Sequence, residues 1–134
     1  MNIAIVVAEF NKEITEKMMD IAKEKATKLN ITVKHTSLVP GVFDMPLVID
    51  TLLQKKEIDA VITLGAVIKG QTKHDELISN AVARALIDLS IKYQKPVTLG
   101  ITGPGMSDRQ ADQRIRPVAE RAVEAEQKLY SEIK

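Results

Sequence analysis

The sequence predicts an α/β fold in which helices cover both faces of a four-stranded parallel sheet. Four short apolar runs, rich in β-branched residues, recur along the chain, and amphipathic helical patterns separate them. The first, third and fourth runs are nearly continuous in apolar residues, as expected of parallel strands that are buried on both faces. Alternation of strands and helices favours a parallel sheet built by right-handed crossovers.

The four predicted strands are residues 3–7, 31–39, 60–66 and 97–101. In the second run apolar and polar residues alternate, as in Ile31, Val33 and His35. Alternation of this kind indicates a half-exposed strand, so we expect this run at an edge of the sheet.

The helical patterns fill the intervals between these strands. They cover residues 12–29, 44–55 and 72–93, and a region from 107 to 133 that Pro117 should end or kink. Asn11 is the expected N-cap of the first helix, and Ser107 with Gln110 forms a capping-box pair. The order βαβαβαβαα predicts a flavodoxin-like three-layer sandwich, a class that binds ligands beyond the carboxyl ends of its strands.

Composition narrows the range of functions. A chain of 134 residues fits one domain covering residues 1–134. Lysine and arginine (19) nearly balance aspartate and glutamate (18), so nucleic acid and membrane surfaces are not expected partners. The chain has no cysteine, no leader before its first strand and no apolar run of the roughly 20 residues that span a membrane. We therefore expect a cytoplasmic protein.

The only two phenylalanines, Phe10 and Phe43, both fall in loops that follow strands. Each could be a hydrophobic staple at a helix start, or the two together could stack on a flat heterocycle. Asp44 is most simply the N-cap of the next helix, although it could instead accept hydrogen bonds from a polar ligand.

The stretch LGAVIKGQTKHDE contains His74, one of two histidines. Thr72 and Asp75 match a capping box, and the helix start after Gly70 would offer free N–H groups to an anion. The positive end of the helix dipole disfavours imidazolium, so His74 could take up and return a proton. A structural histidine is the alternative, and His35 has none of this context.

Four arginines follow the last strand: Arg109, Arg114, Arg116 and Arg121. A solvated helix face is the default interpretation, although any one of them could bind a phosphate through two hydrogen bonds. Periodicity alone does not distinguish them.

Taken in order, AEFNKEIT, VPGVFDMP, LGAVIKGQTKH and KPVTLGITGPGM resemble the 6,7-dimethyl-8-ribityllumazine synthase family, particularly its archaeal branch. The resemblance extends from about residue 3 to beyond Arg114. It implies condensation of 5-amino-6-(D-ribitylamino)uracil with 3,4-dihydroxy-2-butanone 4-phosphate, which releases phosphate and water and needs no cofactor or metal. The product is the lumazine precursor of riboflavin.

The resemblance also implies roles for individual residues. His74 matches the catalytic proton carrier. The positions matching the contacts of the ribitylaminouracil are Phe10, Val42, Phe43, Asp44, Ala66, Val67, Ile68 and Leu99. Those matching the contacts of the butanone phosphate are Gln71, Thr72 and Arg114.

In the family, the residues matching Leu99 and Arg114 come from a neighbouring subunit. The resemblance therefore implies a homo-oligomer with sites between subunits, a pentamer or a 60-subunit shell of twelve pentamers. Leu99 stands where many relatives have a second stacking aromatic residue, and Arg121 is the nearest counterpart of a family lysine.

Two other functions suit the same scaffold. The archaeal riboflavin synthase family shares the fold and a VPG loop and dismutates the lumazine, but it lacks the arrangement of Gly70, Thr72 and His74. A non-catalytic carrier of flavin or lumazine would use Phe10 and Phe43 and leave His74 without a role.

Overall fold

The computed structural model describes residues 1–70 and 73–134. Strands and helices alternate along the chain in the predicted order. The elements are β1 (Asn2–Ala8), α1 (Lys12–Lys28), β2 (Thr32–Val39), the 3-10 turn η1 (Val42–Asp44), α2 (Met45–Leu53), β3 (Ala60–Ile68), α3 (His74–Tyr93), β4 (Val97–Met106), α4 (Asp108–Gln113) and α5 (Ile115–Ile133).

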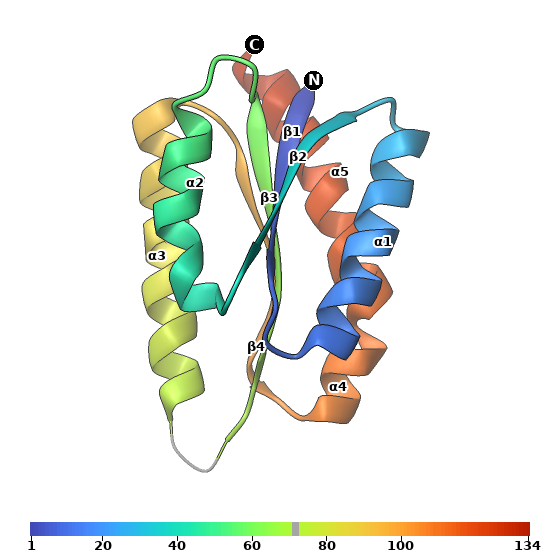
Figure 1. Cartoon of the computed structure of the whole chain (residues 1–134), viewed down its shortest axis with the longest axis vertical. Helices are drawn as coiled ribbons and strands as arrows, with labels where there is room; N and C mark the ends of the chain where they lie inside the picture. The colour runs from blue at the N-terminus through green and yellow to red at the C-terminus, as the bar shows by residue number, and fades with distance from the viewer. Residues whose placement is uncertain (71–72) are drawn as a thin grey trace.

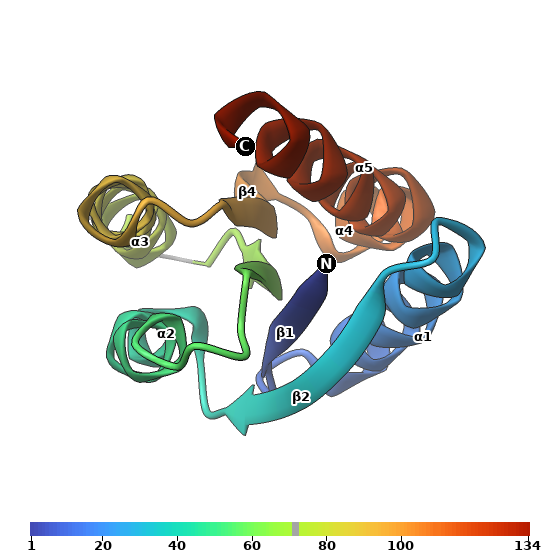
Figure 2. The ribbon, with the colours of Figure 1, turned by 90° about the horizontal axis from the view of Figure 1, so that it is seen from above.

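The four strands form one parallel sheet in the order β2-β1-β3-β4. Helices α1, α4 and α5 cover one face of the sheet, and α2 and α3 cover the other (Figures 1 and 2). The predicted flavodoxin-like three-layer class is therefore confirmed. After β1 the chain continues to β2 on one side, and after β3 it continues to β4 on the other side, so the direction of winding reverses between β1 and β3. Ligands in such folds bind beyond the carboxyl ends of the strands at this point.

The two central strands are buried on both faces. Alternate residues of β1 face opposite layers, so that Ile3 and Ile5 join the core beneath α1 and α5 while Ala4 and Val6 join the core beneath α2 and α3. This burial accounts for the continuous apolar runs in the sequence.

One ionisable side chain of α5 is buried between this helix and the sheet. Glu126 of α5 is fully buried, and neither of its carboxylate oxygens has a hydrogen-bond partner. Burial raises the pKa of Glu126 well above its usual range, because the charged form loses its hydration.

Both edges of the sheet are exposed. The prediction that β2 is an edge strand is confirmed. The expectation that residues 97–101 are buried on both faces is wrong, because β4 forms the second edge and Leu99 is 52% exposed. Some apolar side chains of β4 face outward. The sequence pattern of such an edge strand does not differ from that of a strand buried on both faces.

The last helical region divides where Arg114 joins α4 to α5, three residues before Pro117. Pro117 lies in the first turn of α5, where its missing N–H has no helical partner to lose. The predicted capping box is confirmed, since Ser107 Oγ accepts from the Gln110 N–H and Gln110 Oε1 accepts from the Ser107 N–H. None of the helices in the described part of the chain has the length and apolar character needed to cross a membrane.

Candidate active site

A cavity of about 410 Å³ opens at the carboxyl ends of β1, β2 and β3, beside the start of α3. We call it the sheet-end cavity. Its lining includes seven predicted site residues: Phe10, Val42, Phe43, Ala66, Val67, Ile68 and His74. Its volume lies in the range of small-molecule sites, and most of its lining is apolar.

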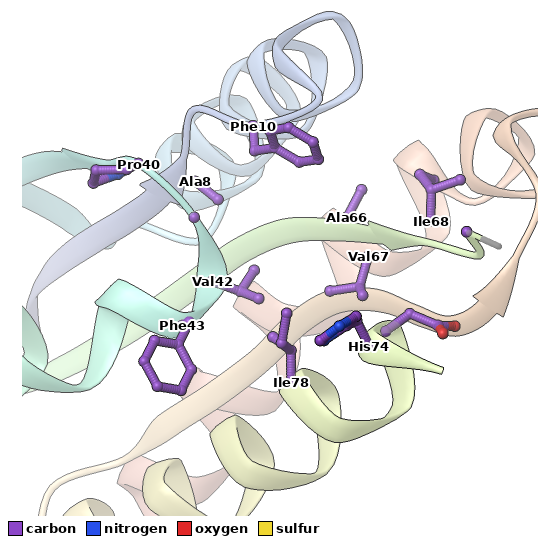
Figure 3. A pocket seen from close by; sticks show the side chains of 13 residues that line it. Ala8, Phe10, Pro40, Val42, Phe43, Ala66, Val67, Ile68, His74 and Ile78 are labelled. Atoms are coloured by element: carbon purple, nitrogen blue, oxygen red, sulfur yellow. The ribbon is translucent and has the colours of Figure 1, made fainter. Parts of the chain in front are cut away.

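Two exposed aromatic rings flank this cavity. Phe10 is 72% exposed and Phe43 is 67% exposed. Figure 3 shows that Phe10, Phe43 and His74 reach the cavity from three different elements, with Val42 and Val67 between them. Neither ring is buried as a staple would be. Exposed aromatic faces beside an apolar cavity suit a flat heterocycle.

Backbone hydrogen bonds join the loop after β1 to the loop after β2. The Glu9 N–H donates to the Val39 carbonyl oxygen at 2.7 Å, and the Phe10 N–H donates to the Pro40 carbonyl oxygen at 3.0 Å. These bonds set the position of the Phe10 backbone independently of its side chain.

Asn11 has a role that the sequence did not reveal. It precedes α1, but its side chain makes no capping hydrogen bond, and its backbone is left-handed at φ 64°. The N-cap prediction is therefore wrong for the side chain. The Asn11 Nδ2 instead donates to the Ala66 carbonyl oxygen at 2.9 Å, which joins the Phe10 loop to the end of β3.

Asp44 also differs from expectation. It stands at the N-cap position of α2, yet its side chain makes no capping bond to that helix. The Asp44 Oδ2 accepts from the Gly41 N–H at 2.9 Å, and so closes the turn that carries Phe43. Asp44 is not among the described residues that line the sheet-end cavity.

His74 is the first residue of α3 and is exposed into the sheet-end cavity. Its predicted place in the first helical turn is confirmed. Gly70 lines the cavity close by. The predicted contacts Gln71 and Thr72, with the expected helix start at Thr72, lie outside the described residues.

Asp75 follows His74 and also lines the cavity, although sequence analysis gave it only a capping role. It is 7% exposed, and its Oδ2 accepts from the Gly105 N–H at 2.9 Å. The sequence contains a pattern that indicates this burial. Asp75, Ile78 and Val82 are spaced three and four residues apart, which places Asp75 on the inward face of α3.

Leu99 and Arg114 lie in a different place from the other predicted residues. They line a second depression of about 210 Å³, formed by β4 and the start of α5, and Arg121 lines it too. We call it the Arg114 hollow. Its lining includes Arg114, which precedes α5, and Pro117, Val118 and Arg121 of α5, which follow Arg114 by three, four and seven residues. Arg116 is not among the residues that line the hollow, and it pairs with Glu120 at 3.7 Å.

The described residues contain no group of three or more His, Asp or Glu side chains placed to hold a metal ion. Among the described residues that line the sheet-end cavity, the ionisable side chains are the imidazole of His74 and the carboxylate of Asp75. Such a set can bind a polar heterocycle and move protons.

The fold and the sheet-end cavity together define a flavodoxin-like α/β protein with a site of the size that small molecules occupy. The family model for 6,7-dimethyl-8-ribityllumazine synthase matches residues 1–133. The chain belongs to the 6,7-dimethyl-8-ribityllumazine synthase family.

Three archaeal relatives of that name illustrate the similarity. The Methanocaldococcus jannaschii protein is 50% identical over 133 residues, which cover 99% of this chain and 94% of the relative. The Saccharolobus solfataricus protein is 57% identical over 127 residues, covering 95% and 82%. The Methanosarcina mazei protein is 52% identical over 128 residues, covering 96% and 95%. The predicted resemblance to the archaeal branch is therefore confirmed.

Proposed function

We propose that this protein condenses 5-amino-6-(D-ribitylamino)uracil with 3,4-dihydroxy-2-butanone 4-phosphate to give 6,7-dimethyl-8-ribityllumazine. Phosphate and water are released. Membership of the synthase family supports the reaction. The arrangement of the sheet-end cavity and the Arg114 hollow supports the assignment of residues to its steps.

The ribitylaminouracil occupies the sheet-end cavity in this proposal. Phe10 and Phe43 offer their exposed faces to the ring and its ribityl chain. Main-chain groups of Ala66, Val67 and Ile68 at the end of β3 hydrogen-bond the uracil edge, and Asp44 shapes the turn that holds Phe43.

Orientation supplies most of the rate acceleration. The aromatic amine attacks the ketone carbon to give a carbinolamine, and the former ketone oxygen leaves as water as the C=N bond of the imine forms. Juxtaposing two reactants in this way can replace a large part of a bimolecular barrier. His74 accepts a proton and returns it during the loss of water and of the phosphate ester.

Arg114 holds the phosphate, through the planar donor geometry that guanidinium groups use for phosphate oxygens. Gln71 and Thr72 are proposed as further phosphate contacts on the resemblance alone. No cofactor or metal is proposed.

One observation carries the proposal that the site lies between subunits. Leu99 and Arg114 line the Arg114 hollow, whereas Phe10 and His74 line the sheet-end cavity. In a ring of identical subunits each interface joins two different surfaces of the chain, so the hollow of one chain can lie against the cavity of the next. We propose a homopentamer, in which exposed Leu99 and Phe10 become covered.

The chain acts as one domain, residues 1–134, and its lack of cysteine suits a reducing cytoplasm, where we place it. A native mass measurement separates a monomer, a pentamer and a 60-subunit shell. A monomeric mass would contradict the shared site.

The reaction is tested by mixing purified protein with both substrates and, separately, with the lumazine alone. Absorbance and mass identify the products. Lumazine formed above the spontaneous rate in the first mixture supports the synthase. Riboflavin formed from lumazine alone would assign the protein to the dismutation reaction. If neither mixture forms a product, the protein is interpreted as a non-catalytic carrier.

The shared site is tested by subunit complementation. His74→Ala and Arg114→Ala chains are each expected to be slow, the first by about 100-fold or less. Equal mixtures refolded together should recover about a quarter of the wild-type rate, because that share of heterologous interfaces pairs an intact His74 with an intact Arg114. Mixtures no faster than their parents would contradict a site shared between subunits.

A further inference from the structure

The first turn of α3 brings an acidic side chain to the wall of the sheet-end cavity. Asp75 lines the cavity beside His74 and is 7% exposed, but the proposed reaction gives it no role. The site receives an anionic phosphate ester, and a carboxylate near that anion disfavours binding. Burial of a carboxylate also costs free energy unless hydrogen bonds compensate it. The presence of Asp75 therefore needs a separate physical reason.

Asp75 contacts the sheet through one end of its carboxylate. Its Oδ2 accepts from the Gly105 N–H at 2.9 Å. Gly105 has a φ of +80° and Gly103 has a φ of +108°, a backbone region that favours glycine. Hydrogen bonds of this kind to carboxylates are stronger than those between neutral groups.

The Asp75 carboxylate accepts this hydrogen bond from a segment of β4 that is itself held in place. Pairing of β4 with β3 shifts register between Ala66 and Ile68, which forms a bulge around residues 103–105. A Cβ added to Gly103 would overlap the carbonyl oxygen of Val67. Beyond the bulge, the Lys69 N–H donates to the Met106 carbonyl oxygen at 2.7 Å. The bulge therefore lies against the end of β3, whose residues line the cavity.

We propose that Asp75 is a positioning residue, which fastens the first turn of α3 to the β4 bulge and so fixes His74 relative to the end of β3. The inference rests on the proposed function, because it assigns His74 the proton transfer. Proton transfer requires a donor and an acceptor within hydrogen-bond reach. A helix end that shifts outward would leave the substrate bound in the cavity and move the imidazole away from it.

A simpler role for Asp75 is to complement the helix dipole, since acidic residues stabilise the first turn of a helix. Glu76 provides a matched comparison. It lies in the same turn and carries the same charge, but its side chain is exposed. A dipole role predicts similar effects from both residues, whereas a positioning role predicts an effect from Asp75 alone.

The test compares kcat and both KM values for four variants. Asp75→Ala removes the acceptor, Asp75→Asn keeps an amide oxygen in its place, and Asp75→Glu keeps the charge but lengthens the link. Glu76→Ala is the control. We expect Asp75→Ala and Asp75→Glu to lower kcat about 10-fold with KM changed less than about 2-fold, because orientation and not binding is lost. Asp75→Asn should keep most of the wild-type kcat, and so should Glu76→Ala.

A double-mutant cycle separates positioning from general damage. If Asp75 acts through His74, Asp75→Glu should change the rate less than about 2-fold in a His74→Ala background. An equal loss of rate in both backgrounds would overturn the proposal, as would an unchanged kcat in the Asp75→Ala and Asp75→Glu chains. Thermal unfolding confirms that each variant is folded, and Asp75→Glu keeps the test available if Asp75→Ala does not fold.

The wild-type protein in the same assay separates two kinds of failure. Wild-type protein that forms no lumazine contradicts the proposed function. Active wild-type protein with Asp75 variants that behave like Glu76→Ala contradicts only the positioning role.

Discussion

The Asn11 side chain joins two strand ends, because its Nδ2 donates to the Ala66 carbonyl oxygen at 2.9 Å while its backbone adopts a φ of 64°. These two properties can be separated by mutation. Asn11→Gly keeps access to the left-handed backbone and loses the hydrogen bond, whereas Asn11→Ala loses both.

We expect Asn11→Gly to lower the free energy of unfolding by about 1 kcal/mol, the typical net contribution of one hydrogen bond. Asn11→Ala should lose roughly 1 kcal/mol more, because of the left-handed backbone. Urea denaturation at one fixed protein concentration measures both changes. An Asn11→Ala chain as stable as the wild type would show that neither property matters to the fold.

Leu99→Phe should strengthen binding of the ribitylaminouracil. Leu99 is 52% exposed in the single chain and lines the Arg114 hollow, which the proposed pentamer sets against the neighbouring sheet-end cavity, so an aromatic ring at position 99 would face the bound heterocycle. Stacking pairs of aromatic groups contribute about 0.5–1.5 kcal/mol, so the KM for this substrate should fall by about 2-fold to 10-fold. Ile133→Phe is the matched control, because Ile133 has the same exposed fraction and lies at the far end of α5. Equal KM values in all three proteins would contradict a stacking role for position 99.

Arg121→Ala should weaken binding of the butanone phosphate. Arg114 and Arg121 line the same hollow, so a phosphate held by the first meets the charge of the second. We expect KM for the phosphate substrate to rise about 10-fold, with a smaller rise at high salt, because screening already weakens the attraction. The control is Arg116→Ala, since Arg116 pairs with Glu120 and is not among the residues that line the hollow. The assignment fails if both variants have the same KM.

Glu126 should make the stability of the protein fall as the pH rises. Burial raises the pKa of Glu126 in the folded chain, so the folded state binds its proton more tightly than the unfolded state does. The contribution is complete below the unfolded pKa and is lost as the pH rises through the folded pKa. Glu126→Gln removes the titration and should therefore be more stable than wild type near about pH 8 and similar near about pH 4.

Urea denaturation across this pH range, at one protein concentration, measures the difference. Glu124→Gln serves as the control, because Glu124 lies on the same helix with a side chain 57% exposed and pairs with Lys25. Parallel pH dependence in wild type and Glu126→Gln would show that Glu126 does not titrate between the two states.

The sequence predicted the layers of the fold because burial leaves a direct mark on composition. Central strands must be apolar on both faces, and the periods of helices and strands differ. The same reasoning failed at β4, where apolar residues face outward at an edge. An apolar surface that a partner subunit would cover has the same composition as a core, so pattern alone does not separate them.

The cavity was also largely predictable, because parallel strands bring their carboxyl ends to one edge of the sheet. Seven of the site residues predicted from the sequence line the sheet-end cavity, and Leu99 and Arg114 line a different hollow. The polar links were not predictable. Their residue types predict that Asn11 and Asp44 are helix caps, but their hydrogen-bond partners depend on distances that only the folded chain sets.

The backbone bonds between the loops after β1 and β2 have a consequence for how this protein can change over time. Main-chain atoms of Glu9, Phe10, Val39 and Pro40 make those bonds, and the Asp44 carboxylate closes the turn that carries Phe43, so neither link uses a phenylalanine side chain. Phe10 and Phe43 can therefore be exchanged without rebuilding the scaffold. Evolution, or a library of variants at these two positions, can therefore alter which heterocycle the protein accepts with little effect on the stability of the fold.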